Sequence, residues 1–144
     1  MNKQEIMRLL KKDHYDINYN EAWLGDFPAL VMMGIAKTVD DIVDLRLTTK
    51  EFDRVIDLYD ISKLDIQRSR FQQRTVYLRN GIVIFDCRER PDRLVQVDGV
   101  LCLPLKDIRE EHSIIMDNDK DKARVKIIDK WVSDNTLDTV NKFN

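Results

Sequence analysis

Two β-rich runs separated by Asn80-Gly81 constrain the fold of this chain more than any other feature of its sequence. Asn-Gly is the strongest short-range signal for a two-residue hairpin turn, because both turn positions need a positive φ. Such a turn between residues 74–79 and 82–87 would place Leu78 opposite Val83 and Val76 opposite Phe85. We expect these four side chains, together with Cys87, to share the buried face of the hairpin.

A second hairpin is indicated by Asp98-Gly99, which joins residues 94–97 to residues 100–103. Pro104 should end its second strand, since proline cannot donate a hydrogen bond to a neighbouring strand. Residues 113–116 are a candidate for a fifth short strand.

Apolar residues recur at helical spacing before residue 71. The clearest helix follows Thr48, where Phe52, Val55, Ile56 and Tyr59 form an i, i+3, i+4, i+7 stripe. Further helices are expected over residues 2–12, from Pro28 onward, over 39–46 behind a hydroxyl cap, and over 62–71. Helical spacing returns after residue 118, which predicts helices over 121–132 and 135–143.

The order of these elements, helices then strands then helices, favours an α+β fold over an alternating α/β fold. We expect an N-terminal bundle of short helices over residues 1–71. An antiparallel sheet of four or five strands, built from the two hairpins, and C-terminal helices should follow over 72–144. The two parts should form one compact unit, because 144 residues correspond to one domain.

The chain carries no sign of export or of membrane insertion. Charges interrupt the first twelve residues before a signal-like apolar core develops. The longest largely apolar run, residues 27–36, is about half of the ~20 residues that a membrane span needs. The two cysteines, Cys87 and Cys102, suit a reducing compartment as small apolar residues. We therefore expect a cytoplasmic protein without a membrane partner.

Charge is distributed unevenly although the formal net charge is only −2, which excludes both a highly basic nucleic-acid coat and an acidic DNA mimic. Residues 38–60 hold seven acids and three bases, whereas residues 66–93 hold seven arginines, three acids and no lysine. Arginine binds carboxylates and phosphates at two points, so this segment is a candidate contact surface. Its predicted partner-binding residues are Arg68, Arg70, Arg74, Tyr77, Arg79, Arg88 and Arg90. The alternative is that acids of the same chain neutralise these arginines.

A helix-turn-helix is a second interpretation of the helical part. Residues 38–47 and 48–59 would be its two helices, and the first hairpin would be the wing of a winged helix. The second of these helices exposes several acids, which phosphate would repel. Residues 62–71, with Lys63, Arg68 and Arg70, would make the better recognition helix.

Metal-binding and catalytic motifs were sought and fail at named residues. Residues 117–121 resemble the start of a calcium loop, but position six is Lys122 rather than glycine and position twelve is Ile128 rather than glutamate. Two cysteines and two histidines are too scattered for zinc, and the four glycines form no phosphate-binding loop. The remaining catalytic candidate is a hydrolase that uses His112 with Glu110 or Glu111 as the orienting acid.

These observations predict a small non-enzymatic regulator or inhibitor that binds a protein partner through a charged surface, with no cofactor and no metal. One alternative is a nucleic-acid-binding regulator that uses the arginine-rich segment 66–93, and another is a hydrolase. A phage or mobile-element origin is compatible with such a protein. The partner and the oligomeric state stay open.

Overall fold

A computed structural model describes residues 1–37, 42–69, 72–114 and 118–144 of the chain. Its strands form a seven-stranded mixed sheet in the order β3-β4-β5-β2-β1-β7-β6. The strands are β1 (Ala22–Leu24), β2 (Val43–Leu47), β3 (Gln67–Arg68), β4 (Arg74–Tyr77), β5 (Ile82–Asp86), β6 (Val95–Val97) and β7 (Val100–Cys102). The helices are α1 (Lys3–Lys11), α2 (Asp26–Met32), α3 (Thr49–Leu58), α4 (Leu105–Ile114), α5 (Asp119–Asp134) and α6 (Leu137–Asn141), with 3-10 turns at Tyr19–Glu21 and Lys63–Asp65.

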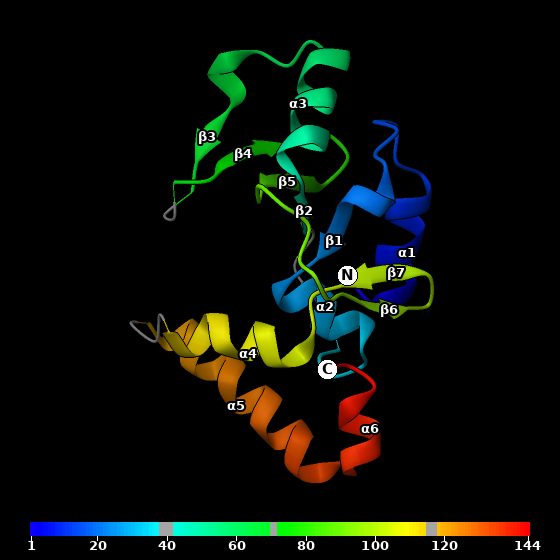
Figure 1. The fold of residues 1–144 in the computed structure, drawn as a ribbon, viewed down its shortest axis with the longest axis vertical. Coiled ribbons are helices and arrows are strands. Elements are labelled where there is room, and N and C mark those ends of the chain that lie inside the picture. The colour runs from blue at the N-terminus through cyan, green and yellow to red at the C-terminus, as the bar shows by residue number, and fades with distance from the viewer. Residues whose placement is uncertain (38–41, 70–71, 115–117) are drawn as a thin grey trace.

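The predicted α+β fold with an antiparallel sheet of four or five strands is wrong. Two strands, β1 and β2, lie in the part that was expected to be a helical bundle, and they occupy the middle of the sheet. β2 runs parallel to β5 and β1 runs parallel to β7, while β1 and β2 are antiparallel to each other. The two predicted hairpins are therefore not neighbours, because β2 and β1 separate them. Figure 1 shows α4, α5 and α6 gathered at one end of the molecule and α3 with β3 and β4 at the other.

The expected helix over 39–46 is a strand over its described part. In β2 the residues Val43, Leu45 and Leu47 are buried, whereas Asp44 and Arg46 between them are partly exposed. This alternation has the period of two that marks a half-buried strand, and it outweighs the cap-like sequence before it. Residues 38–41 lie outside the described part of the chain.

The first hairpin forms, but its predicted register is wrong by one residue. Val76 pairs with Ile84 and Tyr77 with Val83, so the loop contains three residues rather than two. Gly81 has a φ of 89°, whereas Asn80 is not among the residues with positive φ. This fits a three-residue loop that ends in a left-handed glycine. As a result, Val76 shares its face with Ile84, and Val83 and Phe85 lie on the other face.

The second hairpin forms as predicted. Val97 pairs with Val100, and the two-residue turn of Asp98 and Gly99 has φ values of 49° and 83°. Cys87 and Cys102, one beyond β5 and one in β7, are both free thiols.

Several helices were predicted correctly from local signals. Asn2 forms a capping box with Glu5 at the start of α1, and the Thr48 side chain accepts a hydrogen bond from the Glu51 amide at the start of α3. Two further predictions of local structure are wrong. Residues 62–71 form a 3-10 turn and the short strand β3 instead of a helix, as far as they are described. Residues 113 and 114 close α4 instead of starting a strand.

The buried face of the sheet is apolar across its central strands. Ile82, Ile84, Val43 and Leu47 have no exposed surface, and Phe52 of α3 is equally buried against this core. Within the described residues, the structure contains no helix of the length and apolar character needed to cross a membrane.

Candidate polar site at the centre of the sheet

The side chains of Asp44 and Arg46 lie on the face of β2 opposite to Val43, Leu45 and Leu47. Strand pairing places Arg46 beside Trp23 of β1 on one side and beside Phe85 of β5 on the other. Asp44, two residues earlier in β2, lies beside Val83. Paired residues share one face of a sheet, so the second face carries an acid and a base at its centre. The polar site described below is built around these two residues.

Arg46 is tied to helix α4 by a two-point ion pair. Its two terminal nitrogens donate to the two carboxylate oxygens of Glu111 at 2.7 and 2.8 Å. The Arg46 side chain is 22% exposed and that of Glu111 is 42% exposed, so the pair is partly buried. A planar guanidinium matches a carboxylate in this geometry better than any lysine would.

Gly25 leaves the space that the Arg46 guanidinium occupies. A Cβ atom at Gly25 would lie 2.5 Å from Arg46 Cζ, closer than real Cβ contacts come. The backbone of Gly25 is extended, with a φ of −123°, so glycine is required here for the close approach of Arg46 and not for its own conformation. The Arg46 side chain thus packs on the turn between β1 and α2.

Asp26, the next residue, starts α2 and carries two cationic neighbours. Its φ of 49° lies in the left-handed region, which aspartate tolerates better than most residues. Its Oδ1 atom lies 2.8 Å from His112 Nε2. Arg124 Nε is 2.9 Å from the same oxygen, at an angle that makes an ion pair without a hydrogen bond, and the Arg124 guanidinium also lies 5.0 Å from the centre of the Phe27 ring.

His112 joins three elements through its two ring nitrogens. Nε2 binds Asp26 of α2, and Nδ1 lies 2.8 Å from Asp121 Oδ1 at the start of α5. Burial alone lowers the pKa of His112, but the hydrogen bonds to Asp26 and Asp121 outweigh it and raise the pKa above its usual value. Because both ring nitrogens face carboxylates, the imidazolium form, which donates from both, is the form that fits.

The pKa of Asp26 shifts in the opposite direction. Burial by itself raises the pKa of Asp26, but the hydrogen bond from His112 and the charge of Arg124 lower it below its usual value. Asp26 is therefore the charged partner of His112 and Arg124.

Asp44 is the one carboxylate of this group without an ion pair to another described residue. Burial raises the pKa of Asp44 first, the negative charge of Asp26 raises it further, and Arg46 and Arg124 only partly oppose them. Cys87 also lies near Arg46, but burial raises the pKa of its thiol to about 11. A thiol that stays protonated at neutral pH is a poor nucleophile.

The described residues of the site do not form a ligand set for a divalent metal ion. Among the residues that the structure describes, no three histidine, cysteine, aspartate or glutamate side chains converge as a metal would require. Oxygen-rich, net negative ligand sets hold magnesium. Here guanidinium and imidazolium groups take the positions between the carboxylates.

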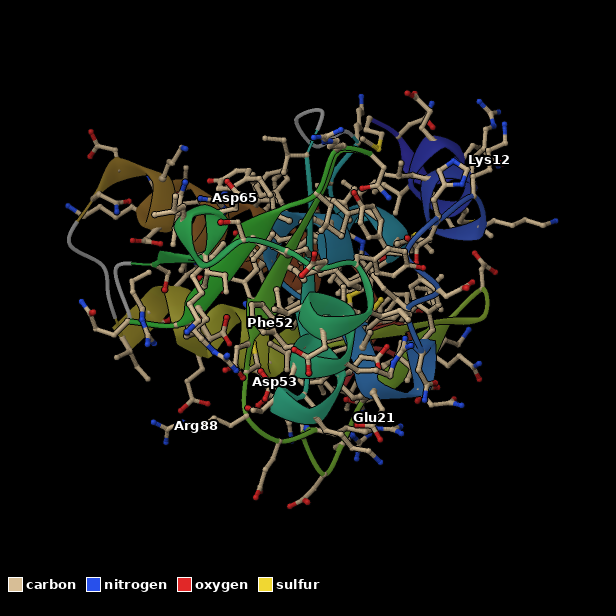
Figure 2. All side chains as sticks on the ribbon, turned by 90° about the horizontal axis from the view of Figure 1, so that it is seen from above. Lys12, Glu21, Phe52, Asp53, Asp65 and Arg88 are labelled. Atoms are coloured by element: carbon tan, nitrogen blue, oxygen red, sulfur yellow. The ribbon has the colours of Figure 1, made fainter. Side chains whose placement is uncertain are left out.

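The sequence-predicted contact residues do not gather on one surface. Arg74 is neutralised by Asp53 of α3 and by Asp86, both at 2.8 Å. Arg68 and Arg90 donate to the carbonyls of Gln72 and Asn20. Arg79 and Arg88 are exposed without a described carboxylate partner, and Arg88 extends away from the ribbon in Figure 2. Tyr77 is 59% exposed on the opposite face from Arg74, and Arg70 lies outside the described residues.

Sequence reasoning missed most of the polar site. It identified His112 but assigned Glu110 or Glu111 as its acid, whereas the hydrogen-bonded acids are Asp26 and Asp121. Asp44 and Arg46 were overlooked because their segment was interpreted as a helix. The alternation of Val43, Leu45 and Leu47 with polar residues was the available signal.

The comparisons with known proteins bear on the fold. No family model matches the chain, and no curated protein matches its sequence. The structure is similar to the crystal structure of a putative nucleotidyltransferase from Thermotoga maritima, with a TM-score of 0.58 over 94% of this chain and 97% of that chain. The two sequences are 12% identical, so the likeness shows a shared fold alone.

The fit between Gly25 and Arg46 predicts a coupled effect on stability. Gly25→Ala should lower the free energy of unfolding by about 1 kcal/mol, because the added Cβ displaces the guanidinium from Glu111 and the partly buried pair is worth about that much. The same substitution in an Arg46→Ala background should cost much less. Urea unfolding of both single variants and the double variant measures this, and equal costs of Gly25→Ala in the two backgrounds would contradict the contact.

The His112 bridge predicts a pH-dependent stability. A pKa raised by folding stabilises the protein fully below the unfolded value near 6.5 and loses that contribution as the pH rises through the folded pKa. The stability difference between the wild type and His112→Gln should therefore be largest at pH 6 and shrink toward pH 9. Urea midpoints across this range test it, and a difference that stays constant with pH would argue against a charged bridge.

Proposed function

We propose that the protein is a non-enzymatic regulator or inhibitor that binds a protein partner in the cytoplasm. The observation that carries the proposal is the internal neutralisation of the polar site. Arg46 holds Glu111, and His112 lies between Asp26 and Asp121. Groups that already satisfy one another in the folded chain leave little binding energy for a charged substrate.

Transfer of a phosphoryl or nucleotidyl group normally needs metal ions held by carboxylates, which offset the charge that develops in the transition state. Asp26 has two cationic partners, and Arg46 lies two residues from Asp44 on the same face of β2. A metal ion at this place would meet positive charge from Arg46 and Arg124. The fold is thus compatible with a protein that has the architecture of its structural neighbour without its activity.

Exposed apolar side chains support a protein partner. Three of them lie on α3, on the 3-10 turn after it and on β4: Leu58 at 57%, Leu64 at 92% and Tyr77 at 59% exposure. Large apolar and aromatic side chains at the surface are typical of protein interfaces. Nucleic acid instead favours a continuous basic surface. Among the described arginines of segment 66–93, Arg74 is neutralised by Asp53 and Asp86.

A nucleotidyltransferase is the rival proposal, and one observation favours it. Asp26 and Asp44 are close enough for the charge of one to raise the pKa of the other, in a chain that shares its fold with a protein of that name. Two neighbouring carboxylates are the minimum that such chemistry needs. A nucleotidyltransferase activity would require Asp44 to act as a catalytic carboxylate beside the positive charges of Arg46 and Arg124.

Affinity capture from a native lysate, with and without nuclease, tests the choice of partner. We expect a defined protein band that remains after nuclease treatment and weakens severalfold with Tyr77→Ala, because truncating an exposed aromatic anchor removes contact area. Lys122→Ala, an exposed change on α5, is the control that should leave the band unchanged. A band that disappears with nuclease, or no band beyond those that an unrelated bait captures, would contradict the proposal.

A further inference from the structure

A groove far from the polar site combines aromatic rings with unpaired carboxylates. It has a volume of about 460 Å³ and lies between the chain that follows α3 and the end of β4. Three tyrosines line it from three segments: Tyr15, Tyr59 and Tyr77. Asp60 and Asp65 line it as well, and Asp65 is visible on its 3-10 turn in Figure 2.

Two of the rings are held in place. Tyr15 and Tyr59 meet edge to face, with ring centres 4.9 Å apart. The Tyr59 hydroxyl donates to the carbonyl of His14 at 3.0 Å, which fixes the ring against the loop after α1. Tyr77 faces solvent from the neighbouring strand β4. A ligand would thus meet one fixed aromatic pair and one exposed ring.

The charges around the groove are mainly negative. Asp60 and Asp65 are exposed, and no described cation forms an ion pair with either. Partial burial and the nearby charges of Asp16 and Asp13 raise the pKa of Tyr59. The opposing cation in the groove lining is Arg79, and Arg54 nearby is already paired with Glu51 at 2.7 Å. The aromatic rings therefore lie in a negative potential.

A cation is the ligand that suits both features. The face of an aromatic ring attracts a lysine ammonium or an arginine guanidinium, and neighbouring carboxylates add to the attraction. A phosphate group would be repelled by Asp60 and Asp65. The groove also includes Gln67 of β3, an edge strand of the sheet, beside which an extended peptide can run.

We propose that this tyrosine groove binds a lysine or arginine side chain of a basic segment in the protein partner. The proposal rests on the proposed function, since it names the chemistry of that partner. It extends the function away from the arginines, because the recognition surface is acidic and aromatic where the sequence suggested a basic one.

Binding of acetylated tetralysine amide to the full chain tests the proposal. Backbone amide shifts in a nitrogen-15 correlation spectrum should move around Tyr15, Tyr59 and Tyr77 and saturate. Tyr77→Ala and Asp65→Asn should each weaken the affinity about two- to fivefold, the size of an exposed cation–π contact. Tyr77→Phe keeps the ring and should keep the affinity, and Asp57→Asn, an exposed acid outside the groove, is the matched charge control.

Several results would overturn the groove as a peptide site. They are shifts located elsewhere, equal binding of tetraglutamate, saturation by tetramethylammonium without tetralysine binding, and occupancy by a short oligonucleotide. The capture experiment separates the two proposals. A nuclease-resistant band without tetralysine binding removes the groove alone, whereas loss of the band with nuclease removes the protein partner.

Discussion

The ionic contacts between the centre of the sheet and the α4–α5 pair connect parts of the chain that are far apart in the sequence. Arg46 and Glu111 join β2 to α4, and His112 joins α4 to Asp26 and Asp121. Each of these charges would be costly to bury alone, and each is acceptable because its partner is fixed by a different element. The contacts connect helices α4 and α5 to strand β2 and to the start of α2.

Local interactions were predictable from the sequence and distant ones were not. The Asp98-Gly99 turn and the capped helix after Thr48 need only a few neighbouring residues, and both form as expected. β1 is three residues long and gains its stability from pairing with β2 and β7, which are distant in sequence. The Asp26–His112 contact spans 86 positions, so no local sequence pattern near either residue indicates it. The register predicted for the first hairpin was wrong because one left-handed residue, Gly81, was sufficient for its loop.

The fold of this protein does not by itself decide its chemistry. It shares an architecture with a structure named as a nucleotidyltransferase, while its own side chains place arginine and histidine among the carboxylates. A fold fixes where a site can lie, and the residues at that place decide its chemistry. Here Arg46 and His112 connect the sheet and α2 to helices α4 and α5, and three tyrosines and two exposed carboxylates line a separate groove.

We propose that the polar site is neutralised by its own chain and carries out no group transfer. The most direct measurement incubates the protein with each radiolabelled nucleoside triphosphate and magnesium or manganese, and follows label transfer to protein or RNA. We expect transfer no greater than in a protein-free reaction, for the wild type and for Asp44→Asn alike. Transfer by the wild type that disappears with Asp44→Asn would contradict it and would establish Asp44 as a working carboxylate.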